Sequence, residues 1–256
     1  MDIGVSIHSS GNGLTNNTIA GRVNGNTNVQ ILGGTITHDV YGGAALAKSN
    51  AGATSYTATV NLLGGTIGGN AYGGGLGDAN TAADVGSTKV NLNGMSLSEY
   101  NINSTLYSSY LTAIDVNSDG DTTDEGVDYY MVNTTNKGCV VSSIFGANNV
   151  NGTPLGDVTV HVYATQNAAA DHIAIQTSDT NPDAANIPKK KGRYDVEAVY
   201  GGGNEAAYDP TDANNGKTVV VIDGWSGLAR LLEGVVGVSD AADGGFTSTE
   251  DFTCLT

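Results

Sequence analysis

The chain contains one stretch of sequence twice. It reads Val-Gln-Ile-Leu-Gly-Gly-Thr-Ile-Thr-His-Asp-Val-Tyr-Gly-Gly over residues 29–43. It then reads Val-Asn-Leu-Leu-Gly-Gly-Thr-Ile-Gly-Gly-Asn-Ala-Tyr-Gly-Gly-Gly over residues 60–75, so the two copies begin 31 residues apart (29 to 60). Self-similarity at a fixed spacing is typical of folds in which one structural unit stacks on the next.

Each copy has two halves. The first half alternates apolar and polar residues, as in Val29-Gln30-Ile31, which predicts a strand with one buried face. A Gly-Gly pair then predicts a turn that requires positive φ, and a second short extended piece ends in Tyr-Gly-Gly. Partial copies follow along the chain: first halves at 90–94 and 219–224, second halves at 18–25, 144–146 and 199–204.

These repeats predict an all-β fold, a parallel β-helix (β-solenoid) over residues 1–224. A unit of two short strands cannot bury its apolar side alone, so units must stack and cover one another. We therefore expect Val29, Val60 and Val90 to form one inward-facing column. Long loops are predicted to be inserted on one side of the stack, the two largest over 103–138 and 164–193. The alternation in 95–102 predicts a further extended segment.

Residues 225–256 no longer carry the repeat. Leu228, Leu231, Leu232 and Val235 follow the i, i+3, i+4, i+7 spacing of a short amphipathic helix, which is expected to cap the open end of the stack. The acidic tail that follows is expected to be disordered.

Composition excludes several classes of function. The chain has 26 acidic and 10 basic residues, a net charge of −16, and such a field repels phosphate backbones, so nucleic acid is not an expected partner. No apolar run approaches the length of a membrane span, so membrane insertion is not expected. The first residues carry no export sequence, which together with the repeats suggests a fragment of a longer exported protein. Two cysteines, Cys139 and Cys254, do not indicate a disulfide framework.

An acidic stretch is the best candidate for a metal site, and calcium is the only cofactor that the sequence suggests. Carboxylates and amides at alternate positions, followed by a glycine for the sharp turn, are the pattern of a calcium-binding loop. Position 12 of this pattern is Gly126 instead of an acid, so Asp124 or Glu125 would have to supply the last ligand. The alternative is an acidic hairpin tip without a metal. The candidate ligands are Asp115, Asn117, Asp119, Asp121 and Asp124.

Three further features bear on function. Tyr41, Tyr72 and Tyr200 occupy one repeat position, which predicts an aromatic stack that is either structural or a sugar-binding ladder. Asp195 and Glu197 lie on one strand face, so this acid pair stays open as the pair of carboxylates that a hydrolase needs. His161 alternates with two valines, so we expect it to point outward as a surface residue.

The glycine-rich repeat sequence resembles that of a known protein family. Val199-Tyr-Gly-Gly-Gly-Asn204 and its continuation to 212, followed by 217–224, are similar to the "VYGGG" repeats of large cell-surface proteins of gut-type Gram-negative bacteria. The resemblance covers about residues 18–224. It implies right-handed β-helix coils, attachment to the cell surface, an adhesin-like role and no established catalytic residues. The partner it implies is a host or microbial surface glycan or protein. A further Tyr-Gly-Gly-Gly, expected soon after Gly224, is missing.

Three functions remain open at this point. The first is a non-catalytic scaffold for adhesion or display, the second a β-helix polysaccharide lyase or glycoside hydrolase, and the third a purely structural spacer. The scaffold is favoured because no catalytic constellation accompanies the repeats.

Overall fold

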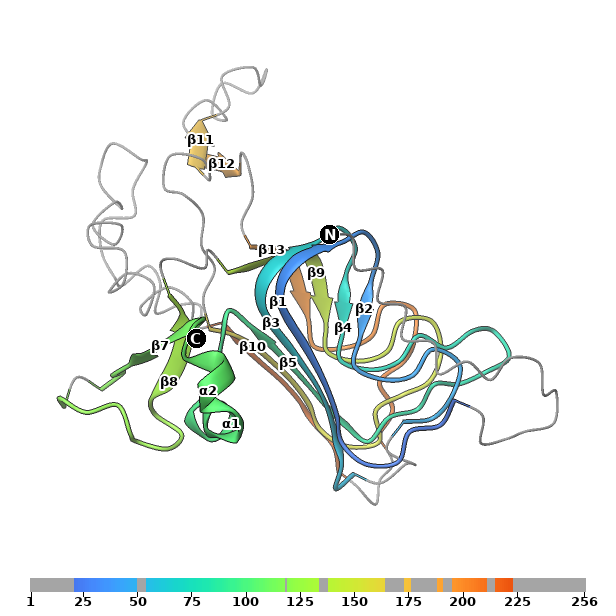
Figure 1. Cartoon of the computed structure of the whole chain (residues 1–256). Coiled ribbons are helices and arrows are strands. Elements are labelled where there is room, and N and C mark those ends of the chain that lie inside the picture. The colour runs from blue at the N-terminus through green and yellow to red at the C-terminus, as the bar shows by residue number, and fades with distance from the viewer. Residues whose placement is uncertain are drawn as a thin grey trace.

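The protein is rich in strands, and most of them belong to one large parallel sheet (Figure 1). The structure is a computed structural model that describes residues 21–49, 54–117, 119–133, 138–163, 173–175, 188–190, 195–210 and 215–222. The nine strands of the large sheet are β1 (Thr27–Ile36), β2 (Val40–Tyr41), β3 (Thr57–Ile67), β4 (Ala71–Tyr72), β5 (Ser87–Leu92), β9 (Cys139–Phe145), β10 (Val158–Val162), β13 (Val196–Tyr200) and β14 (Thr218–Ile222).

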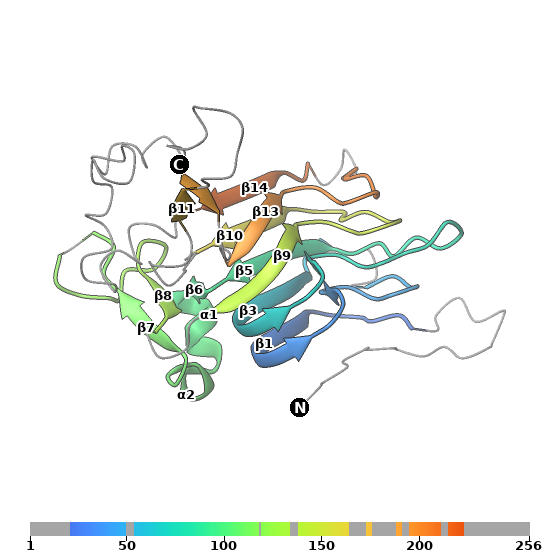
Figure 2. The same ribbon diagram turned by 90° about the horizontal axis from the view of Figure 1, so that it is seen from above.

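The large sheet has two limbs. In the first limb, β1, β3, β5, β10 and β14 pair in this order, and every pair is parallel. In the second limb, β2 pairs with β4, β4 with β9 and β9 with β13, again all parallel. Figure 2 shows the strands of the first limb side by side, from β1 at one end to β14 at the other. The prediction of a strand-rich chain with parallel pairing is therefore confirmed.

Strand β3 passes from one limb to the other at its Gly-Gly pair. Its first part pairs with β5, and its last part, from Gly65 to Ile67, pairs with β9. The corner residue Gly65 has φ of 88°, and its counterpart Gly34 in β1 has φ of 86°. Residues other than glycine rarely adopt this conformation, so the predicted positive φ at the Gly-Gly pair is confirmed at both copies.

The predicted apolar column is present and extends over five strands. Val29 pairs in register with Val60, Val60 with Val90, Val90 with Val160, and Val160 with Val220. The three middle members are fully buried. A spacing of about 4.8 Å between neighbouring strands brings such side chains into contact along the column.

The main core lies between the two limbs. The first limb contributes its inward-facing residues and the second limb contributes the residues that face them. Burying apolar surface of this kind is the main stabilising term of the fold. The buried members are Val40, Val60, Leu62, Ile67, Ala71, Val90, Leu92, Cys139, Val141, Ile144, Val160, Val162 and Val196.

The first long insertion is a folded unit of its own that begins earlier than predicted. It comprises β6 (Gly94–Ser96), α1 (Leu97–Ile102), α2 (Ser104–Tyr107), β7 (Leu111–Ile114) and β8 (Tyr129–Val132), and β8 pairs antiparallel with both β6 and β7. The extended segment predicted over 95–102 is confirmed only at Met95 and Ser96, which belong to β6, and is wrong from Leu97 onward, where α1 begins. Ser96 caps the helix through a capping box with Glu99, and these local hydrogen bonds prevail over the apolar alternation.

The second long insertion is described only in part. It contains the antiparallel pair β11 (Ile173–Ile175) and β12 (Pro188–Lys190). Both insertions follow strands of the first limb, β5 and β10, whereas the shorter loops follow strands of the second limb, so the chain has two insertion points and not one. Residues 1–20 and 223–256, including the predicted capping helix and acidic tail over 225–256, lie outside the described residues.

Candidate functional site

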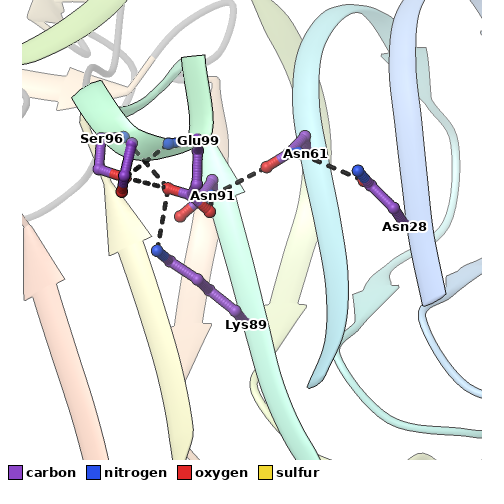
Figure 3. Close-up of polar contacts among 7 residues, drawn as sticks. Asn28, Asn61, Lys89, Asn91, Ser96 and Glu99 are labelled. Atoms are coloured by element: carbon purple, nitrogen blue, oxygen red, sulfur yellow. Dashed lines mark hydrogen bonds and ion pairs between the residues drawn. The ribbon is translucent and has the colours of Figure 1, made fainter. Parts of the chain in front are cut away.

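The outer face of the first limb carries a row of polar side chains, and the first insertion contacts one end of this row (Figure 3). Asn61 Nδ2 donates a hydrogen bond to Asn28 Oδ1 at 3.4 Å, and Asn91 Nδ2 donates to Asn61 Oδ1 at 2.8 Å. Asn61 is 2% exposed and Asn91 is fully buried. Buried carboxamides need partners, and the in-register stacking of the strands supplies them.

Glu99 of helix α1 joins the insertion to this row (Figure 3). Its carboxylate accepts a hydrogen bond from Asn91 Nδ2 at 2.9 Å and forms a salt bridge with Lys89 Nζ at 2.9 Å. It also accepts from the Ser96 hydroxyl at 2.7 Å. Burial raises the pKa of the Glu99 carboxyl, but the Lys89 ammonium and the Ser96 hydrogen bonds outweigh burial and bring the pKa below its ordinary value. The carboxylate therefore stays charged at neutral pH.

Apolar contacts hold the same interface together. Leu63, which follows the first-limb part of β3, is fully buried beside Met95 and Tyr107 of the insertion. Gln30 Nε2 donates a hydrogen bond to the Tyr107 hydroxyl at 2.6 Å. The first insertion is thus packed onto the stack. Asn61 and Asn91 of the polar row are buried, whereas Asn28 at the end of the row is exposed.

His161 continues the polar row but is not the surface residue that the sequence predicted. It pairs in register with Asn91 and points outward as expected, yet the insertion leaves it only partly exposed. Its ring stacks on Tyr163 at a centroid distance of 3.6 Å. Among the described residues, neither His161 Nε2 nor Asn91 Oδ1 has a hydrogen-bond partner. Burial, together with the nearby Lys89 charge, lowers the pKa of His161 to about 4, although Glu99 acts in the opposite direction.

This pKa predicts a loss of stability in mild acid. In the unfolded chain His161 takes up a proton near pH 6.5, whereas in the folded protein it does so only near pH 4. Because the unfolded state binds the proton first, the free energy of unfolding should fall by roughly 2–4 kcal/mol between pH 6.5 and pH 4. Urea unfolding at pH 7, 5.5 and 4.5 measures this. His161→Asn, which would extend the asparagine row, should flatten the slope, and an unchanged slope in that variant would contradict the assignment.

The predicted aromatic stack forms in the second limb and includes one residue that was not predicted. Tyr41 stacks on Tyr72 at 5.0 Å, Tyr72 on Phe145 at 5.0 Å and Phe145 on Tyr200 at 4.7 Å, with interplanar angles of 7°, 10° and 13°. Tyr72 is 1% exposed and both faces of its ring are covered, whereas Tyr200 is 49% exposed. A sugar could not stack on Tyr72. Of the other two candidate ligand-binding residues, Tyr200 is exposed and Tyr41 is partly buried.

The acidic loop between β7 and β8 brings three of its five candidate ligands together. One carboxylate oxygen each of Asp119, Asp121 and Asp124 lies within 4.8 Å of the others. Asn117 Nδ2 donates hydrogen bonds to Asp119 at 2.9 Å and to Asp124 at 3.0 Å. Asp115 accepts from the Gly120 amide at 3.0 Å and so stabilises the turn. Three oxygens at this separation could hold a small hard cation such as calcium.

The charges of this loop repel one another. The Asn117 hydrogen bond lowers the pKa of Asp124, but the charges of Asp119 and Asp121 outweigh it and raise that pKa. In contrast, hydrogen bonds, first from the Asp121 amide and then from Asn117, lower the pKa of Asp119. A bound cation would relieve this repulsion.

Sequence reasoning missed Asp128 at the base of the acidic loop. Asp128 is 3% exposed and accepts hydrogen bonds from the amides of Val116, at 2.9 Å, and Asp124, at 3.1 Å. It thereby joins the two ends of the loop. The sequence did contain a signal for this role. Asp128 stands directly before the apolar run of β8, and a carboxylate next to a buried strand needs hydrogen-bond partners.

Asp195, one member of the acid pair that a hydrolase could use, does not lie in an open site. Asp195 is 2% exposed, and its carboxylate accepts a hydrogen bond from Asn93 Nδ2 at 3.1 Å. Asn93 also accepts from the Cys139 amide at 2.6 Å, so Asp195 belongs to a buried network beside the core. The side chain of Glu197 lies outside the described residues, and its pairing with Asp195 stays a prediction.

Comparison with known proteins gives no match. No protein-family model matches the chain, and no curated protein or solved structure is significantly similar to it. Among the described residues, no helix is both long and apolar enough to cross a membrane.

Proposed function

We propose that this chain is a non-catalytic segment of a right-handed β-solenoid that serves adhesion or display on a bacterial surface, as part of a longer exported protein. The observation that carries the proposal is the in-register column from Val29 to Val220, with parallel pairing at every step. A stack of this kind is a rigid rod that can hold loops at fixed spacing. The partner is a surface glycan or a surface protein.

The position of the first insertion on the stack favours a role in display over a role in catalysis. It occupies the outer face of the first limb through Glu99, Lys89 and Asn91, which are engaged with one another. The buried Asp195 is engaged with Asn93 and is not placed to act as an acid or a base in an accessible cleft. The insertion exposes most of its acidic loop, residues 117 and 119–125, together with residues 101–105 at the end of α1 and the start of α2.

One experiment separates the three functions. The full chain is applied to a glycan array and, in parallel, incubated with acidic and neutral polysaccharides while new reducing ends and unsaturated products are measured. Adhesion predicts binding without cleavage. Cleavage products would overturn the proposal in favour of a lyase or hydrolase. Absence of binding both to glycans and to intact bacterial or epithelial cell surfaces would leave only the spacer.

We further propose that Asp119, Asp121 and Asp124 hold a calcium ion. The closeness of their carboxylates and the raised pKa of Asp124 support this, because a bound ion replaces repulsion by attraction. The sequence pattern adds Asp115 and Asn117 as further oxygen ligands if their side chains turn toward the ion. The ion would stiffen the exposed end of the insertion.

Calcium is therefore expected to raise the thermal midpoint of the full chain by a few degrees at millimolar concentration. The measurement is a thermal unfolding series with calcium, magnesium or a chelator. Asp121→Asn should abolish the calcium effect, whereas Asp209→Asn, which removes an exposed acid outside the loop, should preserve it. Equal responses of the two variants would show that the effect is a general response of an acidic protein to divalent cations.

A further inference from the structure

His161 of strand β10 lies in the contact between the stack and the first insertion. Its ring stacks on the ring of Tyr163, which follows β10. Tyr129 of the insertion strand β8 approaches the same imidazole edge-on, at a centroid distance of 6.4 Å. Tyr129 and Tyr163 are both buried, and their rings lie 5.2 Å apart. A change at His161 therefore acts on side chains that join the insertion to the stack.

This contact encloses two polar atoms that have no hydrogen-bond partner among the described residues. They are His161 Nε2 and Asn91 Oδ1, and both atoms are buried. His161 and Asn91 are register partners on the neighbouring strands β10 and β5. Buried polar atoms normally find a partner, and water would supply one if the insertion moved away. The docked arrangement thus withholds water from two groups that the released arrangement would hydrate.

The charges around His161 do not favour a proton on its ring. The two charged side chains that act on it are Lys89 of β5 and Glu99 of α1. Glu99 already forms a salt bridge with Lys89 and accepts hydrogen bonds from one donor in β5 and one at the start of α1. The uncharged neighbours on the other elements are Tyr129, Tyr163 and Val221 of β14. Protonation of His161 therefore adds a second positive charge beside Lys89, and the one nearby carboxylate is already engaged.

The first insertion can leave the face of the stack without unpairing the large sheet. Strands β6, β7 and β8 form a separate three-stranded sheet and pair with no strand of either limb. The contacts with the stack run through side chains: the salt bridge from Glu99 to Lys89, the hydrogen bond from Gln30 to Tyr107, and the apolar cluster that includes Leu63. Contacts of this kind can open as one unit while both sheets stay paired.

We propose that mild acid releases the first insertion from the stack, because a protonated His161 needs water that the docked arrangement excludes. In the released form His161 takes up a proton near its ordinary pKa of 6.5, whereas in the docked form it does so only near pH 4. The released form binds the proton first, so acid favours it. From pH 7.5 to pH 5 the equilibrium should shift toward release roughly thirtyfold.

Hydrogen exchange measured by NMR on the full chain at pH 7.5 and pH 5 tests this proposal. The carboxamide protons of Asn91 report docking, because that nitrogen donates to Glu99 at 2.9 Å. The amide of Gly73 reports the large sheet, because it donates to the Phe145 carbonyl at 2.9 Å. Each rate is divided by that of an unprotected group at the same pH and then gives the opening equilibrium. Opening should rise roughly thirtyfold at Asn91 and stay unchanged at Gly73.

Variants identify the group that takes up the proton. His161→Gln keeps a polar side chain that does not titrate, so it should abolish the rise at Asn91; His161→Asn is the second choice if that variant does not fold. His38→Gln removes an exposed histidine between β1 and β2 and should preserve the rise. Glu99 stays charged over this range, because its pKa lies below the ordinary value.

Three results would overturn the proposal. The first is an unchanged opening equilibrium at Asn91 between pH 7.5 and pH 5, which would mean that the insertion stays docked in acid. The second is an equal rise at Gly73, which would mean that acid unfolds the whole chain instead of releasing the insertion. The third is an undiminished rise at Asn91 in folded variants that lack His161, which would assign the acid response to another group.

Discussion

Tyr72→Ala is expected to lower the free energy of unfolding by about 3–5 kcal/mol. Tyr72 is buried between the rings of Tyr41 and Phe145, so its removal leaves a cavity and ends two stacking contacts. The loss should appear in urea unfolding of the full chain at pH 7.

Two variants serve as controls for this result. Tyr72→Phe keeps the ring and loses only the hydrogen bond that Asn70 donates to the hydroxyl at 3.3 Å, so it should cost at most about 1 kcal/mol. Tyr41→Ala removes one stacking contact at the end of the row and the hydrogen bonds of the hydroxyl with Asp39 and Asn149, and should cost about 2–3 kcal/mol. If Tyr41→Ala and Tyr72→Ala cost the same, the rings do not form an ordered stack.

Gly73→Val is expected to destabilise the protein by about 3 kcal/mol or more. A Cβ atom at this position would meet the Gly146 carbonyl oxygen and would lie 3.0 Å from Thr88 Cβ. The Thr88 hydroxyl donates a hydrogen bond to the same carbonyl at 2.6 Å, so the site cannot open without losing that bond. Unfolding in urea measures the cost.

Gly33→Val is the matched control. Gly33 lies in β1 and does not have positive φ, and a Cβ atom added there would have no heavy atom within 4 Å. Valine at this position should change the free energy of unfolding by less than about 0.5 kcal/mol. A comparable loss in both variants would mean that the glycine after each aromatic residue is not needed for close packing between successive strands.

The parts of the fold that repetition dictates could be predicted from the sequence. Val29, Val60 and Val90 had to share a column because a one-residue slip would turn their side chains to the opposite face. The Gly-Gly corner and the stacking of Tyr41 on Tyr72 followed from the same register. The partial copy of the second half at 144–146 has Phe145 at the position of the repeated tyrosine. This register explains why Phe145 lies in the aromatic stack.

The parts that depend on one non-repeated segment could not be predicted. Alternation suggested a strand over 95–102, although Ser96 and Glu99 form the spacing of a capping box, which starts helix α1. The salt bridge from Glu99 to Lys89 and the partial burial of His161 beside Tyr129 depend on tertiary packing and have no local sequence pattern. For the acidic loop, the carboxylates could be identified from the sequence. That Asp115 accepts a hydrogen bond from the Gly120 amide could not be predicted.

The central claim, that successive strands lie parallel and in register, is tested most directly by hydrogen-bond scalar couplings in NMR. The amide of Gly42 donates to the carbonyl of Tyr72 at 2.9 Å, that of Gly73 to Phe145 at 2.9 Å, and that of Gly146 to Tyr200 at 2.8 Å. The account predicts a coupling from each of these glycine nitrogens to the carbonyl carbon of that aromatic residue. Couplings that connect the same glycines in antiparallel pairs, or at a shifted register, would contradict it.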